Sequence, residues 1–586
     1  MKQFHEQYKN QIKDLADRMR GDSMPSLTEE LFALFETTGN RLKYEDVYFA
    51  RRKFLAVFGI AAYVFKRRQD VIELEEVLEE ICKEECWALP AHVNRRDNPE
   101  WRNTVDLFAS ETAQALAEIV VLINGSIPGE SKLSDAVCER VKSEIERRVL
   151  IPFEQNKQGW ECSDHNWNAV CGGSVGSAAM YLLAGKEDVR LEKILKRICH
   201  SLTFYLGGFR EDGTCMEGIG YFTYGMTYFI GFAEQLLRCS NGKLNLFDNK
   251  KVRKIAEFQQ KMYFSSGQTV SFSDGDTSAK FRLGLTAFLA KQYDTVQIPN
   301  MEYAADFETD SCYRFMGLLR DYLWTKGLED GKTTRENFVT CARQDVLSYA
   351  QWSICESRNG VGFAIKGGDN GEPHNHNDVG SFLYLVNGEQ LICDLGAGEY
   401  TAEYFGEGRY KILCNSSEGH SVPVVDGKFQ KDGAIYKASF FEADGKGGTR
   451  IEFSGAYEEG TVKKLTREAA LSLENGTLVI TDSFIMDRAE DTNAMSVSEC
   501  FAETLITKGM VSLDGNTLLL QGETASCKIQ IEGNIEDLRV QERIHFTHEG
   551  DQETVRLVRW NVIPEINKGE KGEYYHGVSK YIVWQC

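Results

Sequence analysis

The chain has 586 residues, which is more than one domain usually contains, so two or three domains are expected. Its net charge of −21 argues against nucleic acid or an anionic membrane as a partner. The first residues lack an apolar signal-type segment, no run approaches the roughly 20 apolar residues of a membrane span, and the sixteen cysteines include no CxxC pair. These features predict a cytoplasmic protein with buried free thiols.

The first 330 residues carry the apolar spacing of amphipathic helices. In residues 47–65, for example, Phe54, Phe58 and Phe65 recur at helical intervals. Ten or more helices with short connections are expected, which means helix packed on helix. The predicted helical segments are 47–65, 71–89, 112–123 with an Asn-Gly stop, 132–149, 170–184, 190–206, 221–239, 250–264, 280–292 and 309–325.

The apolar period changes after the polar stretch 326–335. Three pairs of short apolar runs follow, each joined by an Asn-Gly or Asp-Gly turn, at 382–394, 471–481 and 511–520. Repeated hairpins indicate an antiparallel β-sandwich. We therefore predict an α+β multidomain protein, with a helical domain over 1–335 and a sandwich over 336–586.

The most informative stretch, PHNHNDVGSF at 373–382, places His374, His376 and Asp378 within five residues. Histidines two apart point the same way on an extended backbone, so these two can serve one site. Histidine and aspartate together suit a metal centre or a proton-transfer site. A polar loop with unrelated histidines is the alternative reading.

A second candidate region reads WECSDHNWN at 160–168. Its tryptophans could stack on a sugar ring while its amides and histidine bond the ring oxygens. The same residues could instead form a capped helix N-terminus with the tryptophans in the core. The pattern leaves both readings open.

Two further features are compatible with chemistry. Tyr221 and Tyr224 lie three apart on one face of a predicted helix, where a phenol can act as general acid or base, although core tyrosines share this pattern. Asp394 ends the first hairpin and His420 follows it. With His376 they make a plausible zinc set of two histidines and one carboxylate, and a histidine bonded to a backbone carbonyl is the alternative.

Together these features resemble the heparinase II/III-like polysaccharide lyases. A helical half precedes a strand-rich half, and the matching motifs lie between about residues 160 and 430, with HNHNDVGSF the most specific. The motifs are DG-x3-EG-x2-Y ending at Tyr221, HNHNDVGSF, the D-x-G of Asp394–Gly396, and Arg409 with HSVPVVDG starting at His420.

The resemblance implies an (α/α) toroid followed by an antiparallel β-sandwich, with the active site between them. It implies β-elimination at a uronic acid: the C5 carboxylate is neutralised, the C5 proton is removed and the 4-linked oxygen is protonated. Carried onto this sequence, Asn168 with help from His165 would hold the carboxylate, and Tyr221 and His374 would transfer protons. Which of these two takes the C5 proton depends on the uronate's stereochemistry and stays open, as do Asn166 and Tyr224 as substitutes.

The resemblance further implies a structural zinc on His376, Asp394 and His420, and no organic cofactor. The metal would hold the sheet elements around His374. The predicted substrate-binding residues are Trp160, Asn166, Trp167, Tyr224, Tyr404 and Arg409.

The expected partner is an acidic oligosaccharide or polysaccharide of glycosaminoglycan or alginate type. A glycoside hydrolase is a second reading, and it would need a carboxylate pair from Asp164, Asp212 and Glu217. A cupin-like metal enzyme and a non-catalytic carbohydrate-binding protein are further alternatives. The exact glycan, endo or exo action and the oligomeric state stay open, with a homodimer as one candidate.

Overall fold

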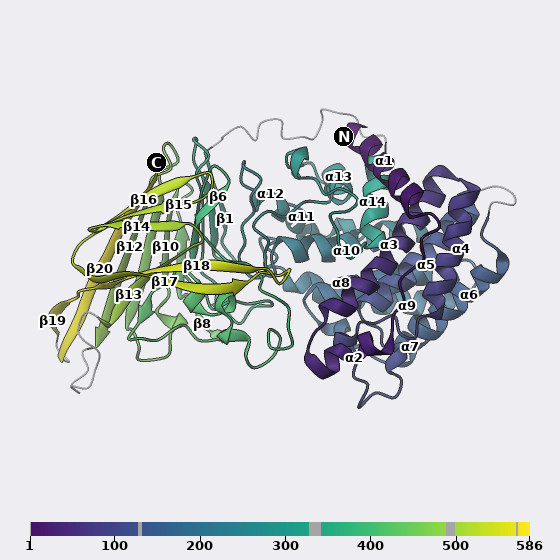
Figure 1. The fold of residues 1–586 in the computed structure, drawn as a ribbon, viewed down its shortest axis with the longest axis horizontal. Helices are drawn as coiled ribbons and strands as arrows, with labels where there is room; N and C mark the ends of the chain where they lie inside the picture. Colours follow the sequence, from purple (N-terminus) through teal and green to yellow (C-terminus); the bar gives the residue numbers. More distant parts are fainter. Residues whose placement is uncertain (1, 127–131, 327–341, 488–498, 570–571) are drawn as a thin grey trace. The chain divides into compact units, whose positions relative to one another are not determined.

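The computed structural model describes residues 2–126, 132–326, 342–487, 499–569 and 572–586. Helices fill the first part of the chain and antiparallel strands the last, as predicted (Figure 1). The chain divides into two compact units. The helical unit consists of Met1–Phe209, Tyr221–Glu257 and Lys280–Arg335, and the sheet unit of Arg210–Gly220, Phe258–Ala279 and Glu336–Cys586.

All ten predicted helical segments contain a helix, and the pattern did not predict α1, α2 and α7. Capping explains several boundaries: Thr28 accepts a hydrogen bond from the Leu31 amide at the start of α2, and Gly39 ends that helix with φ +74°. The helices are α1 (Lys2–Met19), α2 (Glu29–Thr38), α3 (Leu42–Phe65), α4 (Arg68–Lys83), α5 (Leu107–Ser126), α6 (Asp135–Ile145), α7 (Ile151–Gln155), α8 (Asn166–Leu183), α9 (Asp188–Gly208), α10 (Ile219–Cys239), α11 (Lys250–Ala256), α12 (Phe258–Lys261), α13 (Leu283–Gln292) and α14 (Phe315–Thr325).

The helical unit is built around contacts among α3, α5 and α8. Helix α3 contacts α4 and α5, α5 contacts α8, and α8 contacts α9, while α1 lies against α14, the last helix of the unit. Helix α5 is long and apolar enough to cross a membrane, but 72% of the relevant window is buried within the structure, as in a core helix.

A close contact joins the two helices that carry predicted site residues. A Cβ on Gly173 of α8 would lie 2.8 Å from the Tyr228 carbonyl oxygen of α10. Only glycine permits the backbones to approach this closely. Gly173 thereby fixes the spacing between α8 and α10.

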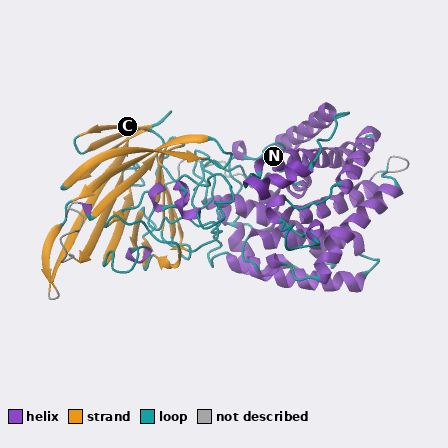
Figure 2. Ribbon diagram, turned by 60° about the horizontal axis from the view of Figure 1, so that its bottom comes forward, coloured by secondary structure: helices purple, strands orange, loops and turns teal. Residues whose placement is uncertain are grey.

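The sheet unit contains the predicted hairpins, each paired in antiparallel register: β5 with β6, β11 with β12 and β14 with β15. Figure 2 colours the strands orange. They are β1 (Arg343–Leu347), β2 (Trp352–Glu356), β3 (Gly362–Lys366), β4 (Asp369–Asn370), β5 (Phe382–Val386), β6 (Glu389–Ile392), β7 (Val424–Val425), β8 (Gly433–Lys437), β9 (Phe440–Ala443), β10 (Gly448–Glu452), β11 (Lys464–Leu471), β12 (Leu478–Asp487), β13 (Phe501–Thr507), β14 (Met510–Asp514), β15 (Thr517–Gln521), β16 (Ser526–Glu532), β17 (Ile535–Phe546), β18 (Gln552–Val562), β19 (Glu565–Gly569) and β20 (Gly572–Gln585).

Three larger sheets share one apolar core. Their strand orders are β1-β2-β3-β5-β6, then β14-β15-β16-β20-β12-β11-β10-β9 with β19 beside β20, and β17-β18-β13-β7. Ile365, Leu465 and Val558 represent the three sheets in that buried cluster. Sheets packed face to face over such a core form a β-sandwich.

Two segments from the helical half of the sequence belong to the sheet unit. Residues 210–220 are tied to the β1–β2 turn, because the Asp212 carboxylate accepts a hydrogen bond of 2.8 Å from the Tyr349 amide. Residues 258–279 are tied to β2, because the Ser265 amide donates to Glu356 over 2.8 Å. The predicted division at 335 and 336 did not separate these segments from the helices. Both of them supply candidate site residues.

Candidate active site

The centre of the candidate site is Asp274, whose side chain is fully buried in the sheet unit. Its Oδ2 accepts hydrogen bonds from His374 Nδ1 at 2.6 Å and from the Tyr400 hydroxyl at 2.8 Å. Its Oδ1 accepts from His376 Nε2 at 3.0 Å and from the Tyr404 hydroxyl at 2.5 Å. One carboxylate therefore joins both histidines of the HNHND motif.

The loop that carries this motif is not extended as predicted. His374 has φ +55°, a left-handed conformation that a non-glycine residue adopts only where its surroundings hold it. Arg409 supplies part of that hold by donating to the Asn375 carbonyl over 2.9 Å. The Asp378 carboxylate pairs with the buried Lys366 ammonium at 2.7 Å. The two histidines serve one site because they bond one carboxylate.

His374 lies between two carboxylates. Asp274 is bonded to Nδ1, and a Glu217 oxygen lies 3.6 Å from Nε2. Burial lowers the pKa of His374, but the hydrogen bond to Asp274 and the charges of Asp274 and Glu217 outweigh it and raise the pKa above its ordinary value. The side chain is 19% exposed, so a substrate can reach it.

The predicted metal set comes together. Ligand atoms of His376, Asp394 and His420 all lie within 4.8 Å of one another, and all three residues are buried. The Nε2 atoms are engaged elsewhere, by Asp274 for His376 and by the Cys414 carbonyl at 2.7 Å for His420. Protons on Nε2 leave the Nδ1 lone pairs for a metal.

The remaining atoms of this set fit a metal ion. Within the described part of the chain, His376 Nδ1, His420 Nδ1 and Asp394 Oδ2 have no hydrogen-bond partner, although all are buried. Such atoms are costly to bury unpaired. His420 Nδ1 lies 3.4 Å from Asp394 Oδ2. Two imidazole nitrogens and one carboxylate oxygen are a donor set that zinc accepts.

The D-x-G motif is explained by a close approach to the Asp274 segment. Gly396 has φ +64°, and a Cβ there would lie 2.4 Å from the Gly275 carbonyl oxygen. The Gly396 amide also donates to Asp394 Oδ1 over 3.0 Å. The glycine therefore lets the metal-ligand segment pack directly against the residue that follows Asp274.

The α8 region of the helical unit forms a helix N-terminus, as the second interpretation predicts, although no side chain caps it. His165 is the N-cap residue of α8 and is partly exposed, and Asn166 opens the helix. Trp160 is a core residue, because it is 6% exposed, stacks on Phe153 and donates Nε1–H to the Val105 carbonyl. This burial contradicts the prediction that Trp160 contacts the substrate.

Asn168 is held entirely within the helical unit. Its amide nitrogen donates to the carbonyls of Glu161, Ser163 and Ser201 at 3.2, 2.8 and 2.9 Å, and its oxygen accepts from the Ser201 hydroxyl at 3.0 Å. The side chain is fully buried. These bonds leave the amide unsuited to a substrate carboxylate. Trp167, by contrast, is half-buried and contacts the His92 ring.

The two tyrosines of α10 have different surroundings. Tyr221 lies in the first turn and is half-buried. Tyr224 donates its hydroxyl to Glu111 over 2.5 Å, and the Arg314 guanidinium lies 4.1 Å from the centre of its ring. Tyr224 is thus engaged by a buried ion-pair network, which disfavours it as a substitute for Tyr221.

The same network predicts a pH-dependent stability. Burial raises the pKa of Glu111 to about 7, against the opposing charge of Arg314 and the hydrogen bond from Tyr224. Because the folded protein holds the Glu111 proton more tightly than the unfolded chain does, protonation stabilises the fold. This stabilisation is fully present below the unfolded pKa of 4.5 and is lost as the pH rises through 7. The free energy of unfolding of Glu111→Gln, measured in urea relative to that of the wild type, should therefore rise by about 3 kcal/mol between pH 5 and pH 8.

The exposed helix residue Glu192 supplies a control for that measurement. Glu192→Gln should follow the wild-type pH profile throughout. Parallel profiles for Glu111→Gln and the wild type would contradict the role given to Glu111.

Two predicted substrate contacts turn out to be internal. Tyr404 is fully buried and bonded to Asp274. The Arg409 guanidinium donates to the carbonyls of Asn375 and Tyr404 and is 13% exposed. Both residues brace the HNHND loop, so contact with a substrate is not their main role.

Sequence reasoning missed Asp274 and Tyr400. Asp274 stands in a polar run, SFSDGDT at 271–277, between the predicted helices 250–264 and 280–292. The run itself was the available signal, because serine, aspartate and glycine together mark an irregular backbone. Nothing in the sequence joins it to a motif 100 residues later.

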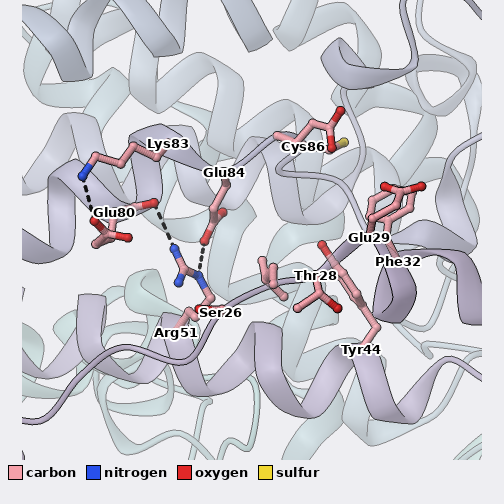
Figure 3. A pocket seen from close by; sticks show the side chains of 12 residues that line it. Ser26, Thr28, Glu29, Phe32, Tyr44, Arg51, Glu80, Lys83, Glu84 and Cys86 are labelled. Atoms are coloured by element: carbon pink, nitrogen blue, oxygen red, sulfur yellow. Dashed lines mark hydrogen bonds and ion pairs between the residues drawn. The ribbon is translucent and has the colours of Figure 1, made fainter.

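A pocket in the helical unit contains none of the predicted site residues (Figure 3). Its volume is about 280 Å³. Figure 3 shows its two cations bonded to wall carboxylates, Arg51 to Glu84 at 2.6 Å and Lys83 to Glu80 at 2.8 Å. We assign this pocket no part in the chemistry, because these pairs leave no described lining cation for a substrate carboxylate.

The sequence of the sheet unit matches a known protein family. Residues 347–570 match the family model for the C-terminal domain of heparinase II/III-like proteins. Among curated proteins, no match to the sequence was found.

Solved structures resemble the chain over nearly its whole length. A mutant of the heparan sulfate lyase HepC from Pedobacter heparinus has a TM-score of 0.61 at 13% identity, covering 98% of this chain and 83% of that one. A heparinase III structure has a TM-score of 0.60 at 13% identity, covering 100% and 91%. The heparinase III product of BT4657, with methylated lysines, has a TM-score of 0.57 at 16% identity, covering 100% and 90%.

At these identities the structural likeness is one of fold, and it confirms the predicted architecture of a helical toroid followed by a β-sandwich. The family model confirms the resemblance for the motifs within residues 347–570, which are HNHNDVGSF, the D-x-G and HSVPVVDG. Residues 347–570 therefore match the C-terminal domain of heparinase II/III-like proteins, within a chain that has the fold of the heparinase III structures.

Proposed function

We propose that this protein is a polysaccharide lyase that cleaves uronate-containing glycans by β-elimination and leaves a 4,5-unsaturated uronate. The observation that carries the proposal is His374, a partly exposed imidazole with a buried carboxylate on Nδ1. The proposed substrates are glycosaminoglycan- or alginate-like chains. One solved protein of the same fold is named for cleaving heparan sulfate, which supports this class.

The first chemical demand is to neutralise the uronate carboxylate, because the C5 proton is barely acidic until that charge is offset. We assign this task to His165, the partly exposed N-cap residue of α8, with Asn166 beside it at 2% exposure. Amide and imidazole groups can both donate hydrogen bonds to a carboxylate. Asn168 is replaced in this role because its own amide is bound inside the helical unit.

The second demand is a pair of proton-transfer groups. Asp274 bonds Nδ1 of His374 and so directs Nε2 toward the substrate, and Tyr221 provides the phenol. The group that faces the C5 proton removes it, and the other protonates the departing 4-linked oxygen. The stereochemistry of the uronate decides between the two assignments.

The metal we propose is a structural zinc, held by His376 Nδ1, His420 Nδ1 and Asp394 Oδ2. A bound zinc would neutralise part of the buried negative charge and cross-link the HNHND loop to the segments that hold Asp394 and His420. His376 and Asp274 then orient His374. The proton transfers themselves need only His374 and Tyr221.

Asn168 and His165 should respond oppositely to substitution. Asn168→Ala removes the three hydrogen bonds that its amide donates to buried carbonyls, while the Ser201 hydroxyl keeps its bond to the Glu161 carbonyl, so it should lower the free energy of unfolding by about 2–3 kcal/mol with turnover largely kept. His165→Ala, at the partly exposed N-cap, should reduce kcat/KM by about 100-fold with little loss of stability, whereas Asn166→Ala, 2% exposed, should lower both. Urea unfolding and steady-state kinetics on the three variants test this, and the reverse pattern for His165 and Asn168 would return the role to Asn168.

One assay tests the proposed reaction. The protein is incubated with glycosaminoglycan and alginate oligosaccharides while the ultraviolet absorbance of a 4,5-unsaturated uronate is followed. An increase in absorbance that matches the increase in reducing ends is expected. Reducing ends without absorbance would establish hydrolysis, and binding without either would establish a carbohydrate-binding protein.

The structure disfavours the hydrolase alternative at one point. A hydrolase needs two carboxylates facing the scissile bond. Asp212 accepts hydrogen bonds from the Tyr349 amide and from Thr214, so it holds a turn. Glu217 lies beside His374, and the second carboxylate there, Asp274, is fully buried and already accepts four hydrogen bonds.

A further inference from the structure

A single buried carboxylate separates the proposed catalytic histidine from the proposed metal set. Each oxygen of Asp274 accepts one hydrogen bond from a histidine and one from a tyrosine. The donors to Oδ2 are His374 and Tyr400, and the donors to Oδ1 are His376 and Tyr404. The two oxygens of one carboxylate are rigidly linked. A change in the ring position of His376 therefore reaches His374 through two bonds of the same group.

The carboxylate has little freedom to absorb such a change. Ser273 and His374 both adopt left-handed backbone conformations, with φ of +60° and +55°. The next residue, Gly275, is in contact on two sides, since added Cβ atoms would lie 2.4 Å from it at Gly396 and 3.2 Å at Gly218. Strained residues persist where their surroundings fix them, so Asp274 is held in place.

Asp274 bonds two histidines, His376 and His374, and the proposed role of each depends on how its ring is oriented. A histidine that ligates a metal through Nδ1 carries its proton on Nε2, and a carboxylate on that proton orients the ring and strengthens the ligand. A histidine that moves protons also needs a carboxylate to set its tautomer and direction. Asp274 meets both needs at once.

We propose that Asp274 is a positioning residue that couples metal occupancy at His376, Asp394 and His420 to the orientation of His374. With metal bound, the His376 ring is fixed and holds Asp274 Oδ1, so Oδ2 holds His374 in one orientation. Without metal, the His376 ring is held by its 3.0 Å bond to Asp274 but by no ligand bond at Nδ1, and His374 loses that part of the restraint. The catalytic meaning of His374 rests on the proposed lyase function, but the coupling itself does not.

The test needs no glycan. Zinc is titrated into metal-free protein against a chromophoric competitor, and the rate at which diethyl pyrocarbonate modifies His374 is followed by mass spectrometry. His200, exposed on α9, serves as the internal reference. In the wild type, zinc should change the His374 rate several-fold and leave the His200 rate unchanged.

Asp274→Asn should bind zinc about 10–100-fold more weakly, and at saturating zinc its His374 rate should no longer respond to the metal. Tyr404→Phe is the milder second variant, because it removes only the hydroxyl donor to Oδ1. It should weaken zinc binding by less than 10-fold and reduce the zinc response of His374 in part. An unchanged zinc affinity in both variants, or an undiminished zinc response of His374, would overturn the proposal.

This outcome is separable from the proposed function. If zinc changes the modification rate of His374 but the protein has no lyase activity, the inference is upheld and the lyase assignment is wrong. Lyase activity with no zinc response at His374 would do the reverse.

Discussion

Replacing His374 with alanine should lower kcat by about 1,000-fold while KM changes by no more than a few-fold. General acid–base groups contribute about 10²–10⁴-fold, because they act on a proton that moves only in the transition state. The substrate's carboxylate and ring contacts come from other residues, so binding should survive. Steady-state kinetics on uronate oligosaccharides, with the unsaturated product as readout, measures both constants.

Two comparisons make this prediction sharp. His200→Ala removes an exposed histidine of α9 and should leave kcat unchanged. Tyr221→Phe should lose turnover to a similar degree, and the double variant should lose little more, since groups that act on one proton-transfer sequence are not additive. Turnover at the wild-type rate in His374→Ala would remove that residue from the mechanism.

Tyr224→Phe separates the two tyrosines of α10. Its hydroxyl bonds Glu111 and its ring lies beside Arg314, so the loss should be one of stability. A variant that folds well but turns over slowly would instead make Tyr224 the catalytic phenol.

Local periodicity predicted most of the fold. The change from helical to strand spacing near residue 330 placed the two architectures correctly, and the glycine turns placed the hairpins. These signals are local, because a helix or hairpin is decided by residues a few positions apart. The stretch 210–220 shows the limit: its attachment to the β1–β2 turn depends on Asp212 meeting an amide 137 residues away.

The residues of the candidate site were predictable only where they lie within one short sequence motif. The HNHND run and the D-x-G motif pointed to His374, His376 and Asp394 because they are compact in sequence. Asp274 was not predictable, since its four hydrogen-bond donors come from 374 to 404. The structure also corrected chemistry inferred from residue type. Trp160 has the side chain of a sugar platform but is 6% exposed, and the Asn168 amide is already bonded.

The same distinction between residue type and environment applies to the metal. Two histidines and an aspartate can be structural without an ion, bonded to each other and to carbonyls. Here both Nε2 atoms are bonded outward, and the inward atoms have no hydrogen-bond partner among the described residues, although His420 Nδ1 lies 3.4 Å from Asp394 Oδ2. Burying three such atoms is unfavourable unless a cation joins them.

Zinc should therefore raise the stability of the sheet unit strongly. A ligand that binds only the folded state stabilises it by about 4 kcal/mol at 1,000 times its Kd, which corresponds to a rise in Tm of about 7 °C for a unit of this size. Differential scanning calorimetry of chelator-treated protein, with and without added zinc, measures the shift. Metal analysis of the untreated protein should find about one zinc per chain.

His420→Ala should abolish that shift, because it removes one of three ligands from a buried site. His545 supplies the matched control: it is a buried histidine of β17, 3% exposed, outside the metal set. His545→Ala should lower Tm through lost packing yet keep the full response to zinc, so fold damage and metal loss are separated. If chelator-treated wild type melts like untreated protein, or if His420→Ala keeps the zinc shift, the three side chains form a metal-free polar cluster, and the orientation of His374 depends on Asp274 alone.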